Sequence, residues 1–374
     1  MKRTTKNKFK KPFYWGVALV NAVLVALFVT SAWGGVINPN TSVIVACLTL
    51  MFPILLILMI IALLVTLVWF KKLALLNLAA LLLCGSQILD YSPLNFSRLS
   101  HQEIAQSKDN LLKVLTYNTF GFNIYGNEDF EGDNPTLEYI LNADADIILM
   151  QEADGIETEK VDSLQRCKLE EAYPHHDITH RGMAIYSKYP FSVVPIKVHD
   201  KAQLDLCRYD VTLPSYGRKI TLFNVHMQSI GLTPGDKQLY KEMTSGGTPT
   251  DTKRIRKGLL SKLAAAFRSR ANQADDIRRA LNSVGGDVIL VGDFNDVPGS
   301  YACQRVKGND MTDAYRQSGF GPAITYHADR FYFRIDHMFY RGDLEAIRSE
   351  CGDCSTSDHY PLITTFMFNE IEQQ

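Results

Sequence analysis

The stretch Asp287-Val288-Ile289-Leu290-Val291-Gly292-Asp293-Phe294-Asn295-Asp296 decides the fold, because it joins an apolar run to a polar end. Four consecutive aliphatic residues, three of them β-branched, predict a fully buried strand. Side chains alternate along a strand, so Asp293 and Asn295 are expected to face the same side. That pair suits orienting a water or binding a hard cation, although the same residues, followed by Pro298-Gly299, are also typical of a turn.

The N-terminal quarter of the chain is far more apolar than the rest. No charged residue occurs between residues 12 and 70. A bilayer span needs about 20 apolar residues, and we expect two spans, at residues 13–36 and 43–70, joined by a turn at residues 34–40. A third run, residues 73–89, is shorter and fits either a third span or an interfacial or core helix. Residues 1–90 are therefore expected to be an all-α membrane region with about three transmembrane helices.

The basic residues predict the orientation of this region. The cluster that precedes the first span comprises Lys2, Arg3, Lys6, Lys8, Lys10 and Lys11, and Lys71-Lys72 form the next one. Basic residues flanking spans stay mostly in the cytoplasm. Three spans would then place everything after Asp90 outside the cytoplasm, on the periplasmic side in a bacterium. Two spans would leave the same part of the chain in the cytoplasm.

The remaining residues are predicted to form a linker, 91–110, and one domain, 111–374. Residues 1–91 contain eight of the 39 Lys and Arg but only one of the 40 Asp and Glu, so 31 basic and 39 acidic residues remain, a net charge of −8. This balance argues mildly against tight binding of duplex DNA. Cys351 and Cys354 form one CxxC pair without a second, which does not fit a structural zinc site. A local disulfide and two free thiols both stay open.

Other apolar runs in this domain also end in Asn, Asp, Glu or His. Together with the stretch quoted above, the polar ends comprise Asn118, Glu152, His226, Asp293, Asn295, Asp336, Asp358 and His359. Core strands usually end in turn residues of varied type. The repeated pattern therefore predicts that these side chains meet in one site.

The chemistry of these side chains indicates hydrolysis of a phosphoester. Carboxylate and amide oxygens are hard ligands that suit Mg²⁺, with Mn²⁺ as a second choice. Histidines can donate a proton or stabilise negative charge. No Ser or Cys lies in a G-x-S-x-G motif, and the chain has no P-loop. Metal-assisted attack of water on phosphorus is the predicted reaction, and a non-catalytic membrane-anchored binding or sensor protein is the alternative.

Seven short segments of the chain also resemble an ordered set of known motifs. They are Tyr117-Asn118, Gln151-Glu152, residues 183–190, Asn224-Val225-His226, Gly292-Asp293-Phe294-Asn295, Arg334-Ile335-Asp336-His337 and Ser357-Asp358-His359-Tyr360-Pro361. In this order they resemble the motifs of the endonuclease/exonuclease/phosphatase superfamily, in particular its deoxyribonuclease I-like and neutral sphingomyelinase-like branches. The resemblance covers residues 111–368. It implies an α+β fold, a four-layer α/β/β/α sandwich in which two mixed sheets pack face to face with helices outside.

The resemblance also implies a role for each residue of the site. Asn118, Glu152 and Asp358 would hold the metal, with Glu152 as the principal ligand. The residues with roles in catalysis or substrate contact would be His226, Asp293, Asn295, Asp336 and His359. Among these, Asp293 would orient or deprotonate the attacking water, Asn295 would contact the phosphoryl oxygen, and His359, paired with Asp336, would stabilise the developing charge. His226 would protonate the leaving oxygen and contact the substrate.

Further substrate contacts, and the substrate itself, stay open at this stage. Arg181 is expected to contact the substrate, and Tyr326, His327, His337 and His180 are further candidates. The expected partners are the lipid bilayer and a phosphoester, either nucleic acid or a phospholipid headgroup or small phosphodiester. The sequence identifies no protein partner. Phe120 stands where the apurinic endonucleases carry an acidic residue, which disfavours that branch.

Overall fold

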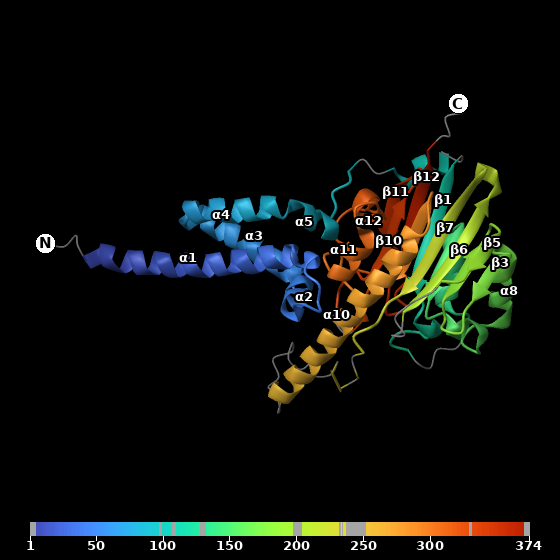
Figure 1. The fold of residues 1–374 in the computed structure, drawn as a ribbon, viewed down its shortest axis with the longest axis horizontal. Coiled ribbons are helices and arrows are strands. Elements are labelled where there is room, and N and C mark those ends of the chain that lie inside the picture. Colours follow the sequence, from blue (N-terminus) through green and yellow to red (C-terminus); the bar gives the residue numbers. More distant parts are fainter. Residues whose placement is uncertain are drawn as a thin grey trace.

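The computed structural model describes residues 5–96, 99–106, 110–127, 132–196, 204–231, 233, 235–236, 252–328 and 331–369. It has two parts, a bundle of N-terminal helices and a domain built on two sheets (Figure 1). The bundle extends away from the domain, and the N-terminus lies at its far end.

The N-terminal helices are shorter and more broken than the hydropathy predicts. Their bounds are α1 Thr5–Ala32, η1 Gly34–Val36, α2 Val43–Leu50, α3 Phe52–Trp69, α4 Lys71–Leu83 and α5 Gly85–Tyr91. Two segments are long and apolar enough to cross a membrane, Lys11–Ala32 and Phe52–Trp69. The second predicted span, 43–70, is interrupted at Met51, after which α3 begins at Phe52 with Pro53 in its first turn. The third run is bent by 61° between α4 and α5, so it counts as a span only if the bent pair crosses together.

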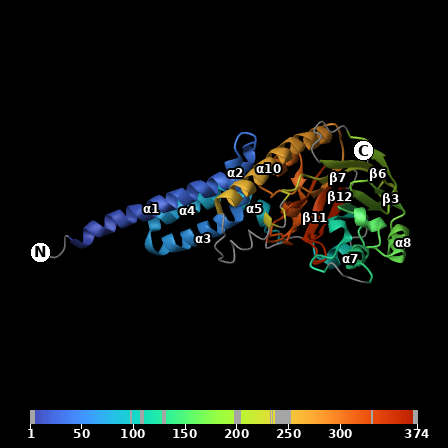
Figure 2. The same ribbon diagram turned by 90° about the horizontal axis from the view of Figure 1, so that it is seen from below.

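The bundle has a core of its own. Helices α1, α3 and α4 lie side by side and alternate in direction (Figures 1 and 2). Phe28, Phe52, Met59 and Cys84 are buried between them. Asn77 in α4 donates a hydrogen bond to the Thr66 hydroxyl of α3 at 3.1 Å. These contacts tie α4 to α3 within the bundle.

The domain consists of two six-stranded mixed sheets. Their strand orders are β11-β12-β1-β2-β4-β3 and β5-β6-β7-β8-β10-β9. The strands of the first sheet are β1 Leu111–Asn118, β2 Ile147–Gln151, β3 His175–Ile178, β4 Ala184–Ser187, β11 Leu344–Cys351 and β12 Leu362–Phe368. Those of the second are β5 Phe191–Val194, β6 Asp205–Leu213, β7 Arg218–His226, β8 Val288–Asp293, β9 Thr312–Asp313 and β10 Asp336–Arg341. One central pair in each sheet is parallel, β1 with β2 and β7 with β8.

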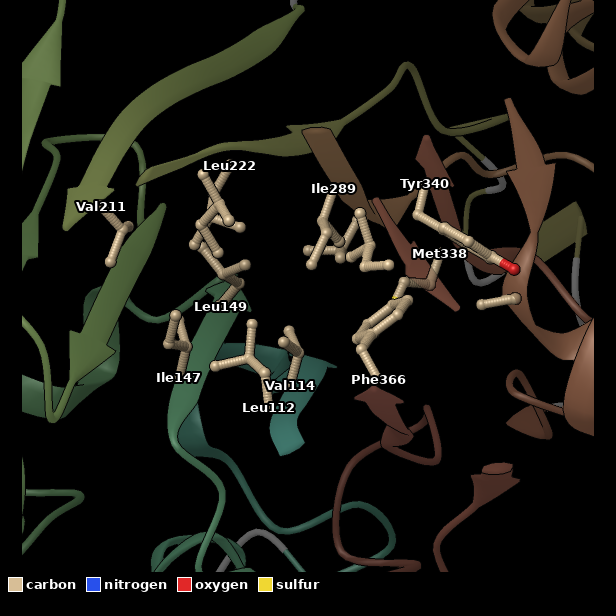
Figure 3. Close-up of a cluster of buried hydrophobic side chains, with 14 of the residues drawn as sticks. Leu112, Val114, Ile147, Leu149, Val211, Leu222, Ile289, Met338, Tyr340 and Phe366 are labelled. Carbon is tan, nitrogen blue, oxygen red and sulfur yellow. The ribbon is translucent and has the colours of Figure 1, made fainter. Parts of the chain in front are cut away.

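The main core lies between the two sheets. Alternate residues of each strand point inward, as the period of a strand requires. Leu112, Val114 and Leu149 of the first sheet face Leu222 and Ile289 of the second (Figure 3). These five side chains are completely buried. Such interdigitation fixes the register of each strand, because a slip of one residue would turn its apolar side chains away from this core.

Helices cover the outer faces of both sheets. Among the described residues, the remaining helices are α6 His101–Gln106, η2 Phe120–Phe122, α7 Pro135–Ala143, η3 Asp154–Glu157, α8 Ser163–Ala172, η4 Pro214–Tyr216, α10 Thr252–Asn282, α11 Tyr301–Lys307 and α12 Ala314–Ser318. Leu137 of α7 and Leu169 of α8 pack on the first sheet, and Ile277 of α10 and Val306 of α11 pack on the second. Asn134 caps the N-terminus of α7, because its side chain accepts from two backbone amides of the first turn. The domain is therefore the expected four-layer α/β/β/α sandwich.

Candidate active site

Four strand ends from the two sheets meet at one edge of the sandwich. Parallel strands end on the same side, so Asn118 pairs in register with Gln151, just before Glu152, and His226 with Asp293. Antiparallel β10 then begins opposite the end of β8, which sets Asp336 beside Asp293. The sheet topology thus brings together residues separated by more than 200 positions in the chain.

The Asp293 carboxylate lies at the centre of this cluster. Its Oδ2 accepts hydrogen bonds from the side-chain amides of Asn118 and Asn295, each at 3.1 Å. Its Oδ1 accepts from the backbone N–H of Asn295 at 2.7 Å. The Nε2 atoms of His226 and His359 both lie 3.7 Å from Oδ2. Asp293 is therefore held from both sheets and faces two imidazoles.

Burial and neighbouring charges shift the pKa of Asp293. Its side chain is 1% exposed, and this burial raises the pKa to about 6, although His359 and His226 oppose the rise and Asp336 adds to it. A carboxylate with a pKa near the working pH is a better proton acceptor than an ordinary aspartate. Asp293 therefore has the environment of a general base.

His359 and Asp336 form a buried ion pair next to Asp293. The His359 Nδ1 atom lies 2.8 Å from Asp336 Oδ2, and the two side chains are 5% and 1% exposed. Burial by itself lowers the pKa of His359, but the carboxylates of Asp336 and Asp293 overcome it and raise the pKa to about 10. His359 is thus protonated at neutral pH and presents a positive charge beside Asp293.

Glu152 stands at the open side of the cluster. Its carboxylate is 41% exposed, and Oε1 accepts from the Asn118 amide at 3.0 Å and lies 3.6 Å from His226 Nε2. Glu152 follows β2 with a φ of +51°, and Asn295 follows β8 with the same value. Such a backbone costs of order 1–3 kcal/mol per non-glycine residue and is characteristic of functional sites. Glu152 also lines a pocket of about 420 Å³ with His226 and Arg181.

The donor atoms at this edge fit a hard divalent cation. Asp293, Asp336 and His359 have potential ligand atoms within 4.8 Å of one another, and Asp336 Oδ1 is buried without a hydrogen-bond partner. In that trio, however, the protonated His359 is already paired with Asp336 and has no free lone pair for a metal. Glu152 instead offers carboxylate oxygens at the pocket, the ligand type that suits Mg²⁺ or Mn²⁺. Asn118 beside it donates from Nδ2 to Glu152, and its oxygen Oδ1 accepts from Phe120 N.

The other predicted site residues, Asn295, Asp358 and Arg181, differ in their contacts with this cluster. The Asn295 amide donates to Met227 O and Asp293 Oδ2, so it holds the Asp293 carboxylate. Asp358 is adjacent to His359 and adds to the rise of its pKa, and its carboxylate accepts from the Ser357 hydroxyl at 3.4 Å. Arg181 is 61% exposed and pairs with Asp205 at 2.7 Å at the rim of the pocket.

The prediction that His337 contacts the substrate is wrong. Its side chain is completely buried, and Nε2 lies 2.9 Å from Asp296 O. Burial lowers its pKa to about 4, so the ring is neutral at physiological pH. Cys351 and Cys354 form no disulfide; both are free thiols.

Sequence reasoning missed the polar support beneath the cluster. The Gln151 amide donates to Asn224 Oδ1 at 2.6 Å, and the Asn224 amide donates to Met150 O at 2.9 Å, so the two side chains link the two sheets directly below Glu152 and His226. Ser357 is a second such residue, because its hydroxyl donates to Asn118 O at 2.8 Å and accepts from His359 N at 3.1 Å. All three residues lie in the motifs quoted above. The order of residues along the chain, however, does not show which partners these side chains hydrogen-bond to.

Comparison with known proteins agrees with this geometry. Residues 115–359 match the model of the Endonuclease/Exonuclease/phosphatase family. The chain belongs to this family. The family resemblance inferred from the motifs is therefore confirmed, and with it a phosphoester-hydrolase fold. Residues 13–91 match a second model, a domain of unknown function, DUF8431. A search of curated protein sequences gives no match to this chain.

Solved structures share the fold at low sequence identity. The catalytic domain of human nocturnin is 18% identical, with 74% of this chain and 99% of that chain covered and a TM-score of 0.50. An endonuclease/exonuclease/phosphatase from Beutenbergia cavernae is also 18% identical, with 69% and 72% covered and a TM-score of 0.45. A mannosyl-6-phosphatase from Bacteroides thetaiotaomicron is 17% identical, with 69% and 100% covered and a TM-score of 0.43. At these identities the likeness concerns the fold alone.

Proposed function

We propose that the protein is a membrane-anchored, Mg²⁺-dependent phosphoesterase that cleaves a phosphodiester or phosphomonoester by attack of water. The single observation that carries this proposal is the buried arrangement of Asp293 between two imidazoles at the edge where Glu152 opens to a pocket. A general base, a protonated histidine and an oxygen-ligand set in one cluster are the groups that this hydrolysis needs.

Each residue has a role that follows from its position. Asp293 Oδ2 accepts the proton of the attacking water, since its pKa lies near neutrality. The buried His359 cation, held by Asp336, stabilises the negative charge that grows on the phosphoryl oxygens. His226, at the pocket, donates a proton to the leaving oxygen, and Arg181 at the rim contacts the substrate.

Glu152 and Asn118 would hold the metal, with Asp358 in support. A bound Mg²⁺ would withdraw charge from the phosphoryl oxygens. Asn118 also donates to Asp293, so the same side chain would keep the base and the metal site at a fixed separation. Asn295 completes this arrangement, because its two hydrogen bonds prevent the Asp293 carboxylate from rotating.

The proposal is tested with the full chain in nanodiscs and bis-p-nitrophenyl phosphate as the probe. The Asp293→Asn variant should retain the fold and lose about 10²–10⁴-fold in kcat, the usual contribution of a general base. Asp343→Asn is the matched control, because this exposed carboxylate follows the end of β10 that is opposite Asp336. Mg²⁺ should support turnover, Mn²⁺ should substitute, and a chelator should abolish it. Wild-type turnover in Asp293→Asn would reject the assignment.

The substrate class is addressed with the same preparation. Plasmid nicking is compared with release of a phosphorylated headgroup from phospholipid vesicles. Activity on a polyanion such as DNA should fall steeply with salt, whereas activity on a single headgroup should change little. The net charge of −8 after residue 91 favours activity on a single headgroup, because proteins that bind the phosphates of nucleic acid are usually basic.

We also propose that the catalytic domain lies outside the cytoplasm. The start of α1 and the start of α4 lie at the same end of the bundle, with the Phe13 and Phe70 rings 6.4 Å apart, and the domain lies at the other end (Figure 1). Cytoplasmic placement of the basic end therefore puts the domain on the opposite side if the bent pair α4–α5 crosses together. A fusion after Gln374 to a reporter that is active only in the cytoplasm should be inactive, and an active fusion would reject this topology.

A further inference from the structure

The N-terminal helices pack against the two segments that flank Asp293 and Asp336. One segment, residues 297–300, follows β8, and the other, centred on Arg334, precedes β10. Strands β8 and β10 are neighbours, with Asp293 and Asp336 opposite each other. Both catalytic carboxylates are therefore attached to backbone that the helices of the membrane region contact.

The first contact is made backbone against backbone at Gly35 and Gly299. A Cβ added to Gly35 would lie 2.4 Å from Gly299 O and 3.2 Å from Ser300 O, so no side chain fits there. A Cβ added to Gly299 would lie 3.1 Å from the Tyr91 hydroxyl oxygen. That hydroxyl accepts a hydrogen bond from Gly299 N at 3.4 Å. The loop after Asn295 is thus pressed directly onto η1 and the end of α5.

Aromatic rings connect this contact to the core of the bundle. The Tyr91 ring lies 4.7 Å from that of Phe52, centroid to centroid, and Phe52 stacks on Phe28 at 5.6 Å. Phe28 and Phe52 are completely buried. Tyr91 is therefore fixed by α1 and α3, and a displacement of these helices would be transmitted to Gly299.

The second contact is made by Arg334, two residues before Asp336. Its Nη2 donates to the Asp90 carbonyl oxygen at 2.7 Å and to Asp313 Oδ2 at 2.8 Å. The side chain is 4% exposed, and Arg316 pairs with the Asp90 carboxylate. A buried guanidinium with two fixed acceptors allows little movement of its backbone.

We propose that residues 13–91, besides anchoring the protein, position the catalytic carboxylates Asp293 and Asp336 through loop 297–300 and Arg334. The inference rests on the proposed function and assigns a role to the part of the chain that matches a domain of unknown function. That match ends at Tyr91, the residue that bonds to Gly299. A misplacement of about 1 Å in a catalytic site is enough to cost roughly 10²-fold in rate, so a modest shift of the loop has a measurable effect.

Gly35→Ala in the full chain in nanodiscs tests this role. The added methyl group must push Gly299 away, so kcat should fall by about 10²-fold with KM nearly unchanged. Amide hydrogen exchange in residues 297–300 should accelerate by about tenfold, because a local opening becomes easier. The matched control is Gly16→Ala, the same substitution in α1 with no atom within 4 Å of the new Cβ. If Gly35→Ala and Gly16→Ala give the same kcat and the same exchange, the inference is wrong.

Tyr91→Phe provides a second test that does not depend on a steric clash. It removes only the hydroxyl that accepts from Gly299 N, so exchange at Gly299 should accelerate and kcat should fall by about tenfold. If Gly35→Ala fails to fold, an unchanged Tyr91→Phe overturns the inference by itself. Exchange is measured without substrate. Faster exchange in both variants of a chain that shows no phosphoesterase turnover would support docking and reject the proposed function.

Discussion

The buried ion pair between Arg270 and Asp296, three residues after Asp293, should make a large contribution to the stability of the domain. Arg270 of α10 is 1% exposed and its Nε donates to Asp296 Oδ2 at 3.0 Å, while Nη1 donates to Gln228 O at 3.0 Å. Asp296 is 5% exposed; its burial raises the pKa of the carboxyl group and Arg270 opposes that rise. In Arg270→Met the carboxylate would be buried without its cation. Loss of one partner of such a pair costs about 3–5 kcal/mol.

This cost should be visible in thermal unfolding of the full chain in detergent. For a domain of this size about 2–4 °C accompany each kcal/mol, so Tm should fall by roughly 6–20 °C. Arg268→Met is the matched control, because Arg268 is exposed on the same helix and its removal should change Tm by no more than about 2 °C. The double variant Arg270→Met/Asp296→Asn should recover much of the loss, since no charge is left buried. An Arg270→Met variant as stable as Arg268→Met would refute the reasoning.

Three further predictions concern the site and its support. Glu152→Gln should remove most of the Mg²⁺-dependent rise in Tm that we expect for the wild-type chain, because a neutral amide replaces the proposed principal ligand; an undiminished rise would place the metal elsewhere. His337, whose pKa is lowered to about 4 from 6.5, contributes stability that is full above pH 6.5 and is lost as pH falls toward 4, about 3 kcal/mol in all. His337→Gln should flatten urea-unfolding stability over that range, and an unchanged slope would contradict the burial argument. Asn224→Leu should cost about 1–3 kcal/mol, because it removes the two hydrogen bonds by which Asn224 links Gln151 to Met150 O, each contributing about 0.5–1.5 kcal/mol; a neutral effect on urea unfolding would show that this bridge between the sheets is dispensable.

The strands and the membership of the cluster could be predicted because both depend on simple periodicity, whereas the four-layer arrangement of the sheets and helices was predicted only from the family resemblance. Alternating apolar residues place one face of each strand in the core, and polar residues at strand ends mark the edge. Asn118, His226 and Asp293 are predicted in this way. In the structure Asn118 pairs in register with Gln151, and His226 pairs with Asp293. The pairing of His359 with Asp336 came from the family resemblance, and the structure has it at 2.8 Å. The alternation of apolar and polar residues cannot predict this contact, because it does not show which way the side chains at the strand ends point.

The N-terminal helices show the limit of hydropathy. Residues 43–70 are uniformly apolar, yet the structure interrupts them at Met51, where α2 ends and α3 begins. Hydropathy measures how well a residue tolerates lipid, and it does not distinguish a residue in lipid from one packed on protein. Helix α2 lies at the domain end of the bundle, beside α10 (Figures 1 and 2). Asn40, just before it, donates to Asn272 of α10 at 3.2 Å.

The docking of the bundle onto the catalytic domain was beyond sequence reasoning for a different reason. Its main contacts use groups that every residue has, the carbonyl oxygens of Asp90 and Gly299 and the amide of Gly299. The side chain that matters most at this contact is the one that Gly35 lacks. A glycine in a predicted turn between spans is expected whether or not anything packs against it. What distinguishes Gly35 is only the proximity of a loop more than 260 residues further along the chain, and Gly35→Ala is therefore the substitution that separates a passive anchor from one that supports the active site.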